Sequence, residues 1–328
     1  MKIRALLLAA VLGTSLLAAP ADAAAQLSVG VAFDIGGRGD KSFNDAAAAG
    51  LEKAQKQFDF NLEAVVTDGT STDREKRIRS LLTKNCNPII AIGSGYAPTL
   101  QALAVEFPNT QFAIINDASV AALNVTSLVF ADTQGAYLAG FSAAQVSKSG
   151  KVAMIANPSQ ADMYKDGFSA GVFASKKKVI PIVKYVSGSY SIATNQVLDA
   201  GADVVFVATQ GSDSEVFKSI VARNAKKKGS NIGLINIEPD QYITVTSATK
   251  KFLIASVVKR VDKAIYDVIA LSTAKKQYLD ILDADAGIYG RRYGITGGGI
   301  EFTIRSKDLA ALSDAINIAA ATAEKISA

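Results

Sequence analysis

The stretch SVGVAFDIGGRGDKSFNDAAAAGLEKA, residues 28–54, decides the expected fold of this chain. It opens with a short apolar run from Val29 to Phe33, continues through a turn rich in glycine, and ends in a segment with helical spacing. Apolar residues recur there every three or four positions and predict one buried helical face: Phe43, Ala47, Leu51, Ala54 and Phe58. The stretch therefore predicts a strand, a glycine turn and a helix.

The start of that helix carries a capping pattern and a group of polar side chains. Ser42 and Asp45 stand three residues apart, which predicts a capping box: the serine oxygen accepts from the third backbone NH and the aspartate reaches back. Ligands of open α/β sheets bind outside the carboxyl ends of the strands. Four side chains are expected at that point: Asp34, Asp40, Phe43 and Asn44. The alternative for Phe43 is packing against the neighbouring loop.

Residues 1–25 have the pattern of a removable secretory signal peptide. Lys2 and Arg4 precede an apolar run from Ala5 to about Ala19, and small residues follow it. This run is too short to be a good membrane anchor, although an uncleaved anchor is the alternative. No later stretch of the sequence is long and apolar enough to span a bilayer, so we expect an exported, soluble mature protein.

Strand and helix patterns alternate along the rest of the chain. The expected strands are 62–67, 89–93, 112–116, 127–131, 152–156, 179–185, 204–208, 232–237 and 254–258. The expected helices include 74–83, 134–147, 213–228, 260–271 and 307–326. This alternation predicts βαβ units in parallel sheets with helices on both faces. The chain length predicts two domains, and this many strands suit two doubly wound sheets better than one.

Composition and motifs argue against several kinds of function. The chain has no histidine, which removes Ser-His-Asp catalysis, Cys-His catalysis and the commonest zinc ligand. The glycine turns around Gly37 and Gly93 miss the spacing of nucleotide-binding loops, so any coupled ATP hydrolysis is expected on another subunit. Three acidic residues lack the remaining ligands of a calcium loop and predict a surface turn: Asp280, Asp283 and Asp285.

The charge pattern does not point to nucleic acid. A formal net charge of +5 is mild for 328 residues. The two runs of three lysines lack the interleaved aromatic residues and glycines of nucleic-acid modules. We therefore expect both runs on solvated surface and no nucleic-acid partner.

Further polar and aromatic side chains lie at or near the ends of the predicted strands. Asn116 and Asp117 end the strand FAII, Glu238 follows GLINI, and Lys259 follows IASVV. Phe206 lies within the strand of ADVVFVATQG. Each has an ordinary explanation: core packing for Phe206, a solvated helix start for Lys259 and a turn for Asn116. Because the carboxyl ends of parallel strands meet at one edge of a sheet, we expect these residues to converge on one cleft.

The opening stretch also resembles a known family. Its segment DIGGRGDKSFNDAAAAGLEKA is similar to the first motif of the basic membrane protein or purine nucleoside receptor family of ABC-transporter substrate-binding lipoproteins. That motif reads Asp-x-Gly-Gly, then Asp-x-Ser-Phe-Asn, then a helix. Further segments resemble family blocks in family order: FAII, QGAYLAGFSAA, GADVVFVATQG, EPDQY, ASVVKRVDKAIYDVI and YGITGGGIEF. The resemblance runs over residues 28–303 and covers nearly all of the expected mature chain.

The resemblance implies the type I periplasmic binding protein fold, an α/β fold with two doubly wound parallel-sheet lobes joined by a hinge. In this fold the chain passes between the lobes three times, and we expect the passages near Ala131, Val258 and Gly298. The expected lobes are then 26–131 plus 259–298 for lobe 1, and 132–258 plus 299–328 for lobe 2.

The resemblance also implies a purine site between the lobes. In relatives the purine ring is held between two phenylalanines, which match Phe43 and Phe206 here. Polar residues of the first motif line the same pocket in relatives, and they match Asp34, Asp40 and Asn44. Stacking on an aromatic ring contributes about 1–3 kcal/mol per base, so two rings would supply much of the binding free energy.

Two positions depart from the family pattern. Asn116 stands where relatives have an aspartate that reads the base, with Asp117 displaced by one residue. An amide both donates and accepts, so adenine would suit this position as well as guanine or hypoxanthine. Lys259 matches a lysine that holds ribose, but Glu238 stands where relatives have an aspartate for ribose. A free purine base or a modified nucleoside is therefore an alternative to an ordinary nucleoside.

The expected function is that of a periplasmic solute-binding component of an ABC importer for a purine nucleoside or purine base. It is not expected to be an enzyme or to need a cofactor or metal; its partners would be an inner-membrane permease with a separate ATPase subunit, and it would be a monomer. The alternatives are a binding protein for a different small solute, in an importer or a sensor, and a nucleoside hydrolase. Cys86 is the only cysteine, so a lipid-attachment cysteine is absent and we expect free diffusion in a Gram-negative periplasm.

Overall fold

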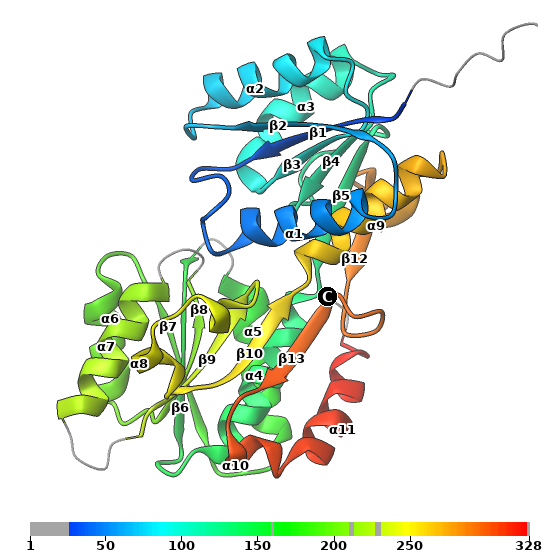
Figure 1. Cartoon of the computed structure of the whole chain (residues 1–328). Helices are drawn as coiled ribbons and strands as arrows, with labels where there is room; N and C mark the ends of the chain where they lie inside the picture. The colour runs from blue at the N-terminus through cyan, green and yellow to red at the C-terminus, as the bar shows by residue number, and fades with distance from the viewer. Residues whose placement is uncertain (1–25, 159–160, 210–212, 227–230, 327–328) are drawn as a thin grey trace, which may run out of the picture.

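The computed structural model describes residues 26–158, 161–209, 213–226 and 231–326. The predicted signal peptide, residues 1–25, lies outside the described residues, and so do the last two residues of the helix expected over 213–228. The described chain forms two α/β lobes placed end to end (Figure 1). Each lobe is built on one mainly parallel sheet, which confirms the predicted fold class.

The first lobe contains a seven-stranded sheet in the order β11-β12-β5-β4-β3-β1-β2. Its strands are β1 (Ser28–Phe33), β2 (Asn61–Val66), β3 (Ile89–Ile92), β4 (Phe112–Ile115), β5 (Val125–Phe130), β11 (Asp280–Asp283) and β12 (Ile288–Tyr293). β11 runs antiparallel to β12, and the other pairings of this sheet are parallel.

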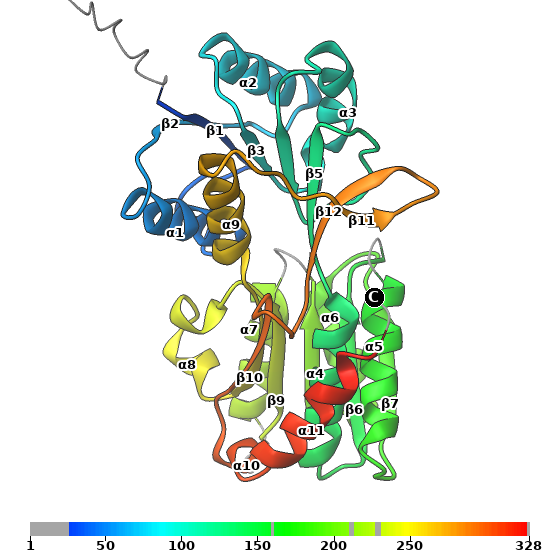
Figure 2. The ribbon, with the colours of Figure 1, turned by 90° about the vertical axis from the view of Figure 1, so that its right-hand side faces the viewer.

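Helices cover both faces of the first sheet. One face packs against α1 (Phe43–Gln55) and α9 (Val261–Thr273), and the other against α2 (Ser71–Thr83) and α3 (Ala97–Glu106), as Figures 1 and 2 show. Because successive strand residues point to opposite faces, the two sides of β1 enter different cores. Val31 packs in the core on the α1 side, whereas Ala32 packs with residues of α2 and α3.

The second lobe contains a six-stranded sheet in the order β13-β10-β9-β8-β6-β7, with β13 antiparallel to β10. Its strands are β6 (Lys151–Ala156), β7 (Ile180–Tyr185), β8 (Val204–Ala208), β9 (Gly233–Glu238), β10 (Leu253–Lys259) and β13 (Ile300–Ile304). The helices on its two faces and beyond β13 are α4 (Asp132–Val146), α5 (Ala161–Ala174), α6 (Tyr190–Asp199), α7 (Asp213–Lys226), α8 (Ser247–Lys250), α10 (Lys307–Ala310) and α11 (Ser313–Ala323).

Helices α4 and α5 pack unusually closely because glycines lie at their contact. A Cβ atom added at Gly140 would lie 2.0 Å from the carbonyl oxygen of Phe168, and one added at Gly171 would lie 2.0 Å from that of Tyr137. Only glycine allows backbones to approach this closely. The contact fixes the relative position of the two helices whose first turns meet beside the cleft.

The chain passes between the sheets three times. The first passage follows β5 at Ala131, the second follows β10 at Arg260, and the third lies between β12 and β13. The passages are tied together, since the Ala131 NH donates to the Tyr293 carbonyl at 2.9 Å and the Arg260 NH to the Gly299 carbonyl at 3.0 Å. Lys259 pairs with Ile300 across β10 and β13, immediately before the second passage.

The structure corrects several expected elements. Three strands were not expected, and one of them, β11, occupies part of the surface turn expected from the acidic residues. These strands have mixed or exposed side chains, such as IYGRRY in β12, and so lack a clear apolar pattern. The helix expected over 307–326 is broken after Ala310 into α10 and α11.

Candidate functional site

Asp40 organises the start of α1. Its Oδ1 accepts from the backbone NH of Ser42 at 2.8 Å and that of Asp45 at 3.1 Å, and its Oδ2 accepts from the NH of Asn44 at 2.9 Å. The expected capping box is therefore wrong. The Ser42 side chain makes no cap hydrogen bond, and the Asp45 carboxylate accepts from the NH of Gly39 and of Lys41 instead.

Asn44 and Asp34 hold the glycine turn. The buried Asn44 amide accepts from the NH of Asp34 at 3.0 Å and donates to the carbonyls of Asp34 and Ile35, both at 3.3 Å. The Asp34 carboxylate forms an ion pair with Arg74 of α2 at 2.7 Å. Arg74 also donates to the carbonyl of Gly69 at 2.7 Å. Arg74 is thus a residue of this region that the sequence analysis missed, because its partner lies 40 residues away.

A cavity of about 340 Å³ lies at the carboxyl ends of β1, β3, β4 and β9, between the two lobes. Its lining includes six of the predicted residues: Asp34, Asp40, Phe43, Asn44, Asn116 and Glu238. Glu238 comes from the second lobe and the other five from the first. The expected convergence at the strand ends is therefore found for these six side chains.

Lys259 lies buried directly behind this cavity. Its ammonium is 2.8 Å from Asp132 Oδ2, 3.0 Å from the Tyr164 hydroxyl and 3.5 Å from Asn116 Oδ1. It also lies 5.8 Å from the centroid of the Phe43 ring. Burial lowers the pKa of Lys259, but Asp132 and the neighbouring acidic groups reverse this effect and hold it above its ordinary value. Asp132 and Tyr164 were not among the expected site residues.

The structure contradicts the stacking role expected for Phe206. Its side chain is fully buried in β8, on the side covered by α4 and α5. The ring stacks on Phe168, with centroids 5.6 Å apart and an interplanar angle of 11°, and meets Tyr164 edge-on at 6.3 Å. Phe206 is thus a core residue here. Asp117 also does not line the cavity; its carboxylate accepts from the NH and the hydroxyl of Ser119 in a local turn.

Glu238 of the second lobe forms a hydrogen bond with a residue of the first. Its side chain is 2% exposed at the end of β9, and its Oε2 accepts from the Ser42 hydroxyl of the first lobe at 3.4 Å. Burial raises the pKa of Glu238 to about 8, with a further contribution from Asp213, while Lys259 acts in the opposite direction. The surroundings of Glu238 thus favour its neutral form.

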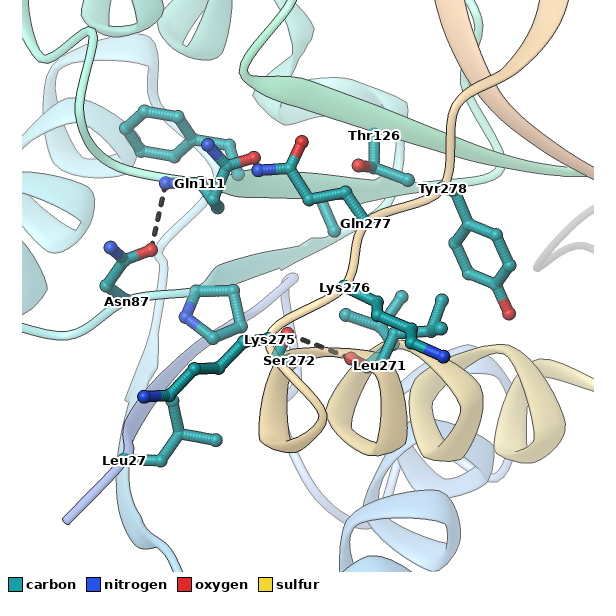
Figure 3. A pocket seen from close by; sticks show the side chains of 14 residues that line it. Leu27, Asn87, Gln111, Thr126, Leu271, Ser272, Lys275, Lys276, Gln277 and Tyr278 are labelled. Atoms are coloured by element: carbon teal, nitrogen blue, oxygen red, sulfur yellow. Dashed lines mark hydrogen bonds between the residues drawn. The ribbon is translucent and has the colours of Figure 1, made fainter. Parts of the chain in front are cut away.

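Other cavities lie outside this arrangement. One, of about 340 Å³, shares Asp40 and Ser42 with the first and extends over α7 and α8 of the second lobe. Another, of about 310 Å³, lies at the opposite end of the first sheet, between the strand starts and the end of α9 (Figure 3). Its lining contains Lys275, Lys276 and Tyr278 but none of the predicted site residues. The cavity that gathers six of the predicted residues, including Asp34, Phe43 and Glu238, is therefore the candidate site.

Residues 27–326 match the family described as "ABC transporter substrate-binding protein PnrA-like" (Bmp). The chain belongs to this family. Bmp proteins are substrate-binding proteins of ABC transporters, which are not enzymes. This assignment confirms the family expected from the opening motif and implies a small-molecule ligand and a membrane permease as partners.

Curated relatives support the same family at low identity. The chain is 29% identical over 268 residues to the CD4+ T-cell-stimulating antigen of Listeria innocua, covering 75% of this chain and 74% of the relative. It is 26% identical over 260 residues to the ABC transporter nucleoside-binding protein BmpA of Lactococcus lactis, covering 74% of each. The first of these names carries no ligand, and the second names nucleosides for that relative.

Solved structures support the fold. A transcriptional activator of the comK gene from Bacillus halodurans superposes with a TM-score of 0.69 at 20% identity, covering 90% of this chain and 97% of that one. An ABC transporter solute-binding protein from Aeropyrum pernix superposes with a TM-score of 0.66 at 21% identity, covering 91% and 86%. The Bmp chain therefore has the type I periplasmic solute-binding fold.

The described residues contain neither a membrane-spanning helix nor a metal-binding cluster. Across those residues, no helix combines the length and apolarity needed to cross a membrane. Within the same ranges, no group of three or more acidic, cysteine or histidine side chains is arranged to hold a metal ion.

Proposed function

We propose that this Bmp protein binds a purine nucleoside or a purine base in the cavity between its lobes and delivers it to an ABC permease. The observation that carries the proposal is the cavity itself, where the Phe43 ring lies among hydrogen-bonding groups from both lobes. Its volume of about 340 Å³ lies within the usual range of about 300–1,000 Å³ for small-molecule sites. The nucleoside-binding relative from Lactococcus supports the ligand class.

Each group of the proposed site has a distinct task. Phe43 stacks on the base, which contributes about 1–3 kcal/mol. Because Phe206 lies in the core, Phe43 is the aromatic ring assigned to this task. Asn116 presents both a donor and an acceptor to the edge of the base. The ammonium of Lys259 lies behind Phe43 and Asn116, and Asp132 neutralises it.

We propose that the protein carries out no reaction on its ligand. A hydrolase would need a free carboxylate to activate water, but those at the cavity are engaged. Asp34 is paired with Arg74, and Asp40 accepts from backbone NH groups of α1. Burial favours the neutral form of Glu238, in which it cannot act as a base. The protein would therefore release its ligand unchanged, as a monomer in the periplasm, to an inner-membrane permease with a separate ATPase.

The first test is to identify the ligand that the protein carries. Small molecules released by denaturing freshly purified protein are identified by mass spectrometry and then titrated calorimetrically against ligand-free protein, together with adenosine, inosine, guanosine and hypoxanthine. We expect one of these purines to bind one to one and to be recovered intact. Recovery of a sugar or amino acid, with no binding of any purine, would contradict the proposal.

The stacking task is tested by Phe43→Ala. Loss of one base contact of about 1–3 kcal/mol predicts affinity weaker by about 5- to 150-fold, with unfolding unchanged within error, since Phe43 is only partly buried. Phe173→Ala is the matched control, because Phe173 is 69% exposed on α5, away from the cleft. Equal affinities for the two variants would remove Phe43 from the site.

A further inference from the structure

The described part of the protein fully buries few charged side chains, and all of them lie at the cleft end of the second sheet. They are Asp132, Asp213, Glu238 and Lys259. Three are carboxyl groups and one is an ammonium. With every group ionised, the set would carry two uncompensated negative charges in a low-dielectric region, which is strongly unfavourable. At least one carboxyl group is therefore expected to hold a proton.

Lys259 carries the one ammonium of this set, and it is paired with Asp132. Lys259 is 2.8 Å from Asp132, in a buried ion pair that also includes a hydrogen bond to the Tyr164 hydroxyl at 3.0 Å. Asp213 is satisfied differently, because its carboxylate accepts from the Thr209 hydroxyl and, at 2.7 Å, from the Gln241 amide. Among the described residues neither Asp213 nor Glu238 has an ion pair, but Asp213 accepts from two side chains whereas Glu238 accepts from the Ser42 hydroxyl alone, at 3.4 Å, so Glu238 is the less compensated of the two.

Burial and the carboxylates packed around Glu238 favour its neutral form, and Lys259 opposes them. Asp213 on α7 and Asp132 on α4 repel its negative charge, and Lys259 on β10 attracts it while already paired. Tyr164 on α5 is neutral, since burial raises its pKa further above the ordinary value.

The first-lobe residues that line the cavity include no cation, and Lys41 beside Ser42 is exposed. The Ser42 hydroxyl donates to Glu238, while Asp34 and Asp40 line the same cavity. Arg74, which reaches this region from α2, is paired with Asp34.

We propose that Glu238 faces the cleft as a neutral carboxylic acid, because Asp132 takes the ammonium of Lys259, and that this acid donates a hydrogen bond to the ligand. This inference rests on the proposed function and specifies one subsite of it. Oε2 accepts from Ser42, so the proton is carried by Oε1. The ligand group that suits a buried O–H donor is an acceptor without charge, such as a ring nitrogen or a carbonyl oxygen.

The protonation state is tested first on the ligand-free protein. Carbon-13-labelled glutamate is followed by NMR as the pH rises, in the wild-type protein and in Glu238→Gln. We expect one glutamate carboxyl group to titrate near pH 8, in line with the raised pKa, and to be missing from Glu238→Gln. Glu215→Gln, at an exposed position of α7, should leave that signal in place. A Glu238 signal that titrates in the ordinary range would overturn the proposal.

The role of Asp132 is tested by Asp132→Asn. This variant keeps the shape of the side chain and frees Lys259 to compensate Glu238. We expect the Glu238 signal to titrate at clearly lower pH in Asp132→Asn than in the wild type. An unchanged or higher titration midpoint would show that the ion pair does not control Glu238. This readout would not move if Asp132 had only a packing role.

The hydrogen bond to the ligand is tested with adenosine, which does not titrate over this pH range. If only the neutral acid binds, affinity should be about tenfold weaker at about pH 9 than at about pH 7, because the competent fraction falls by that factor. Glu238→Gln, an uncharged donor, should bind with the same affinity at both values. Equal wild-type affinities at both values would overturn the subsite while leaving the proposed function intact. Absence of adenosine, inosine, guanosine and hypoxanthine binding at either value would instead refute the proposed function, and the ligand-free titration would still decide the state of Glu238.

Discussion

At the scale of single residues, Asp40 is a loop side chain that caps α1 and so positions residues at the cleft. Its two carboxylate oxygens accept three backbone NH groups at the start of α1, where the helix has no intrahelical acceptors for them. This cap positions Phe43 and Asn44 at the cavity. The sequence pattern favours Ser42 as the capping residue, but the cap comes from Asp40, two residues earlier.

The cap predicts unequal effects for two neighbouring substitutions. Asp40→Ala should lower the free energy of unfolding by about 1–2 kcal/mol, because the capping acceptor is lost. Ser42→Ala should change the free energy of unfolding by no more than about a few tenths of a kcal/mol, since the Ser42 hydroxyl makes no cap hydrogen bond. Urea unfolding monitored by circular dichroism measures both. A larger loss for Ser42→Ala than for Asp40→Ala would restore the capping box.

Glu238 predicts a pH dependence of stability. Its pKa is about 8 in the folded protein against an ordinary 4.5, so between these values the unfolded state binds fewer protons than the folded state. The contribution of Glu238 to stability is then complete below about pH 4.5 and is lost as the pH rises toward 8. Relative to Glu238→Gln, the wild-type free energy of unfolding should fall by about 1.4 kcal/mol per pH unit across this window. Parallel urea series at several pH values measure the difference, and two curves of equal slope would show that Glu238 is ionised in the folded protein.

The sequence predicted which polar residues lie near the cleft better than it predicted their contacts. Asp34 and Glu238 were expected there because they stand at strand ends, and Asn44 because it stands at a helix start, which are local properties of the chain. The partners Arg74 and Asp132 were not expected, since each lies far from its partner along the chain. Long-range pairing of this kind has no local signal in one sequence.

At the scale of elements, the close contact of α4 and α5 supports the site from behind. The first turn of α4 carries Asp132, and the first turn of α5 carries Tyr164, whose hydroxyl is 3.2 Å from Asp132 Oδ2. The glycines along the same contact keep the helices close. Separation of α4 and α5 would therefore disturb the ion pair with Lys259.

This contact predicts a strong effect for Gly171→Ala. The added Cβ would lie 2.0 Å from the Tyr137 carbonyl oxygen, which cannot move without the backbone of α4. We expect the free energy of unfolding to fall by about 1–3 kcal/mol or more. Gly188→Ala is the matched control, because a Cβ there meets no atom within 4 Å. Thermal or urea unfolding compares the two, and equal stabilities would mean that the helices can move apart at no cost.

The elements that the sequence predicted share a strong apolar pattern. Buried parallel strands such as β3, β4 and β8 are continuous apolar runs, and the structure contains them. Strands β11 and β12 lie at one edge of the first sheet, where exposed and charged side chains hide the pattern. For Phe206 the strand was predicted correctly but the role of the side chain was not. The alternation of side chains along β8 does not show which face packs against α5 and which could meet a ligand. That depends on tertiary packing.

At the scale of the whole molecule, the two lobes are joined at the cavity by side-chain hydrogen bonds from Ser42 to Glu238 and from Lys259 to Asn116, and by the three passages of the chain. A ligand between the lobes would add contacts to both and so favour the closed arrangement, since a ligand shifts a conformational equilibrium by its difference in affinity for the two states. Hinge motion of this kind is the step that a permease would recognise.

Closure predicts a change in distance between the lobes when the ligand binds. Lys41 and Ser214 are exposed, lie on opposite lobes and line the same cavity, so spin labels on Lys41→Cys and Ser214→Cys report their separation. Cys86 is buried and should not take a label. We expect the distance distribution to shift to shorter values when a purine ligand is added, while the control pair Lys41→Cys and Lys56→Cys, both on the first lobe, stays unchanged. Tight binding with an unchanged distance between Lys41 and Ser214 would mean that the protein holds its ligand without hinge closure, and that a permease must recognise the bound state by another feature.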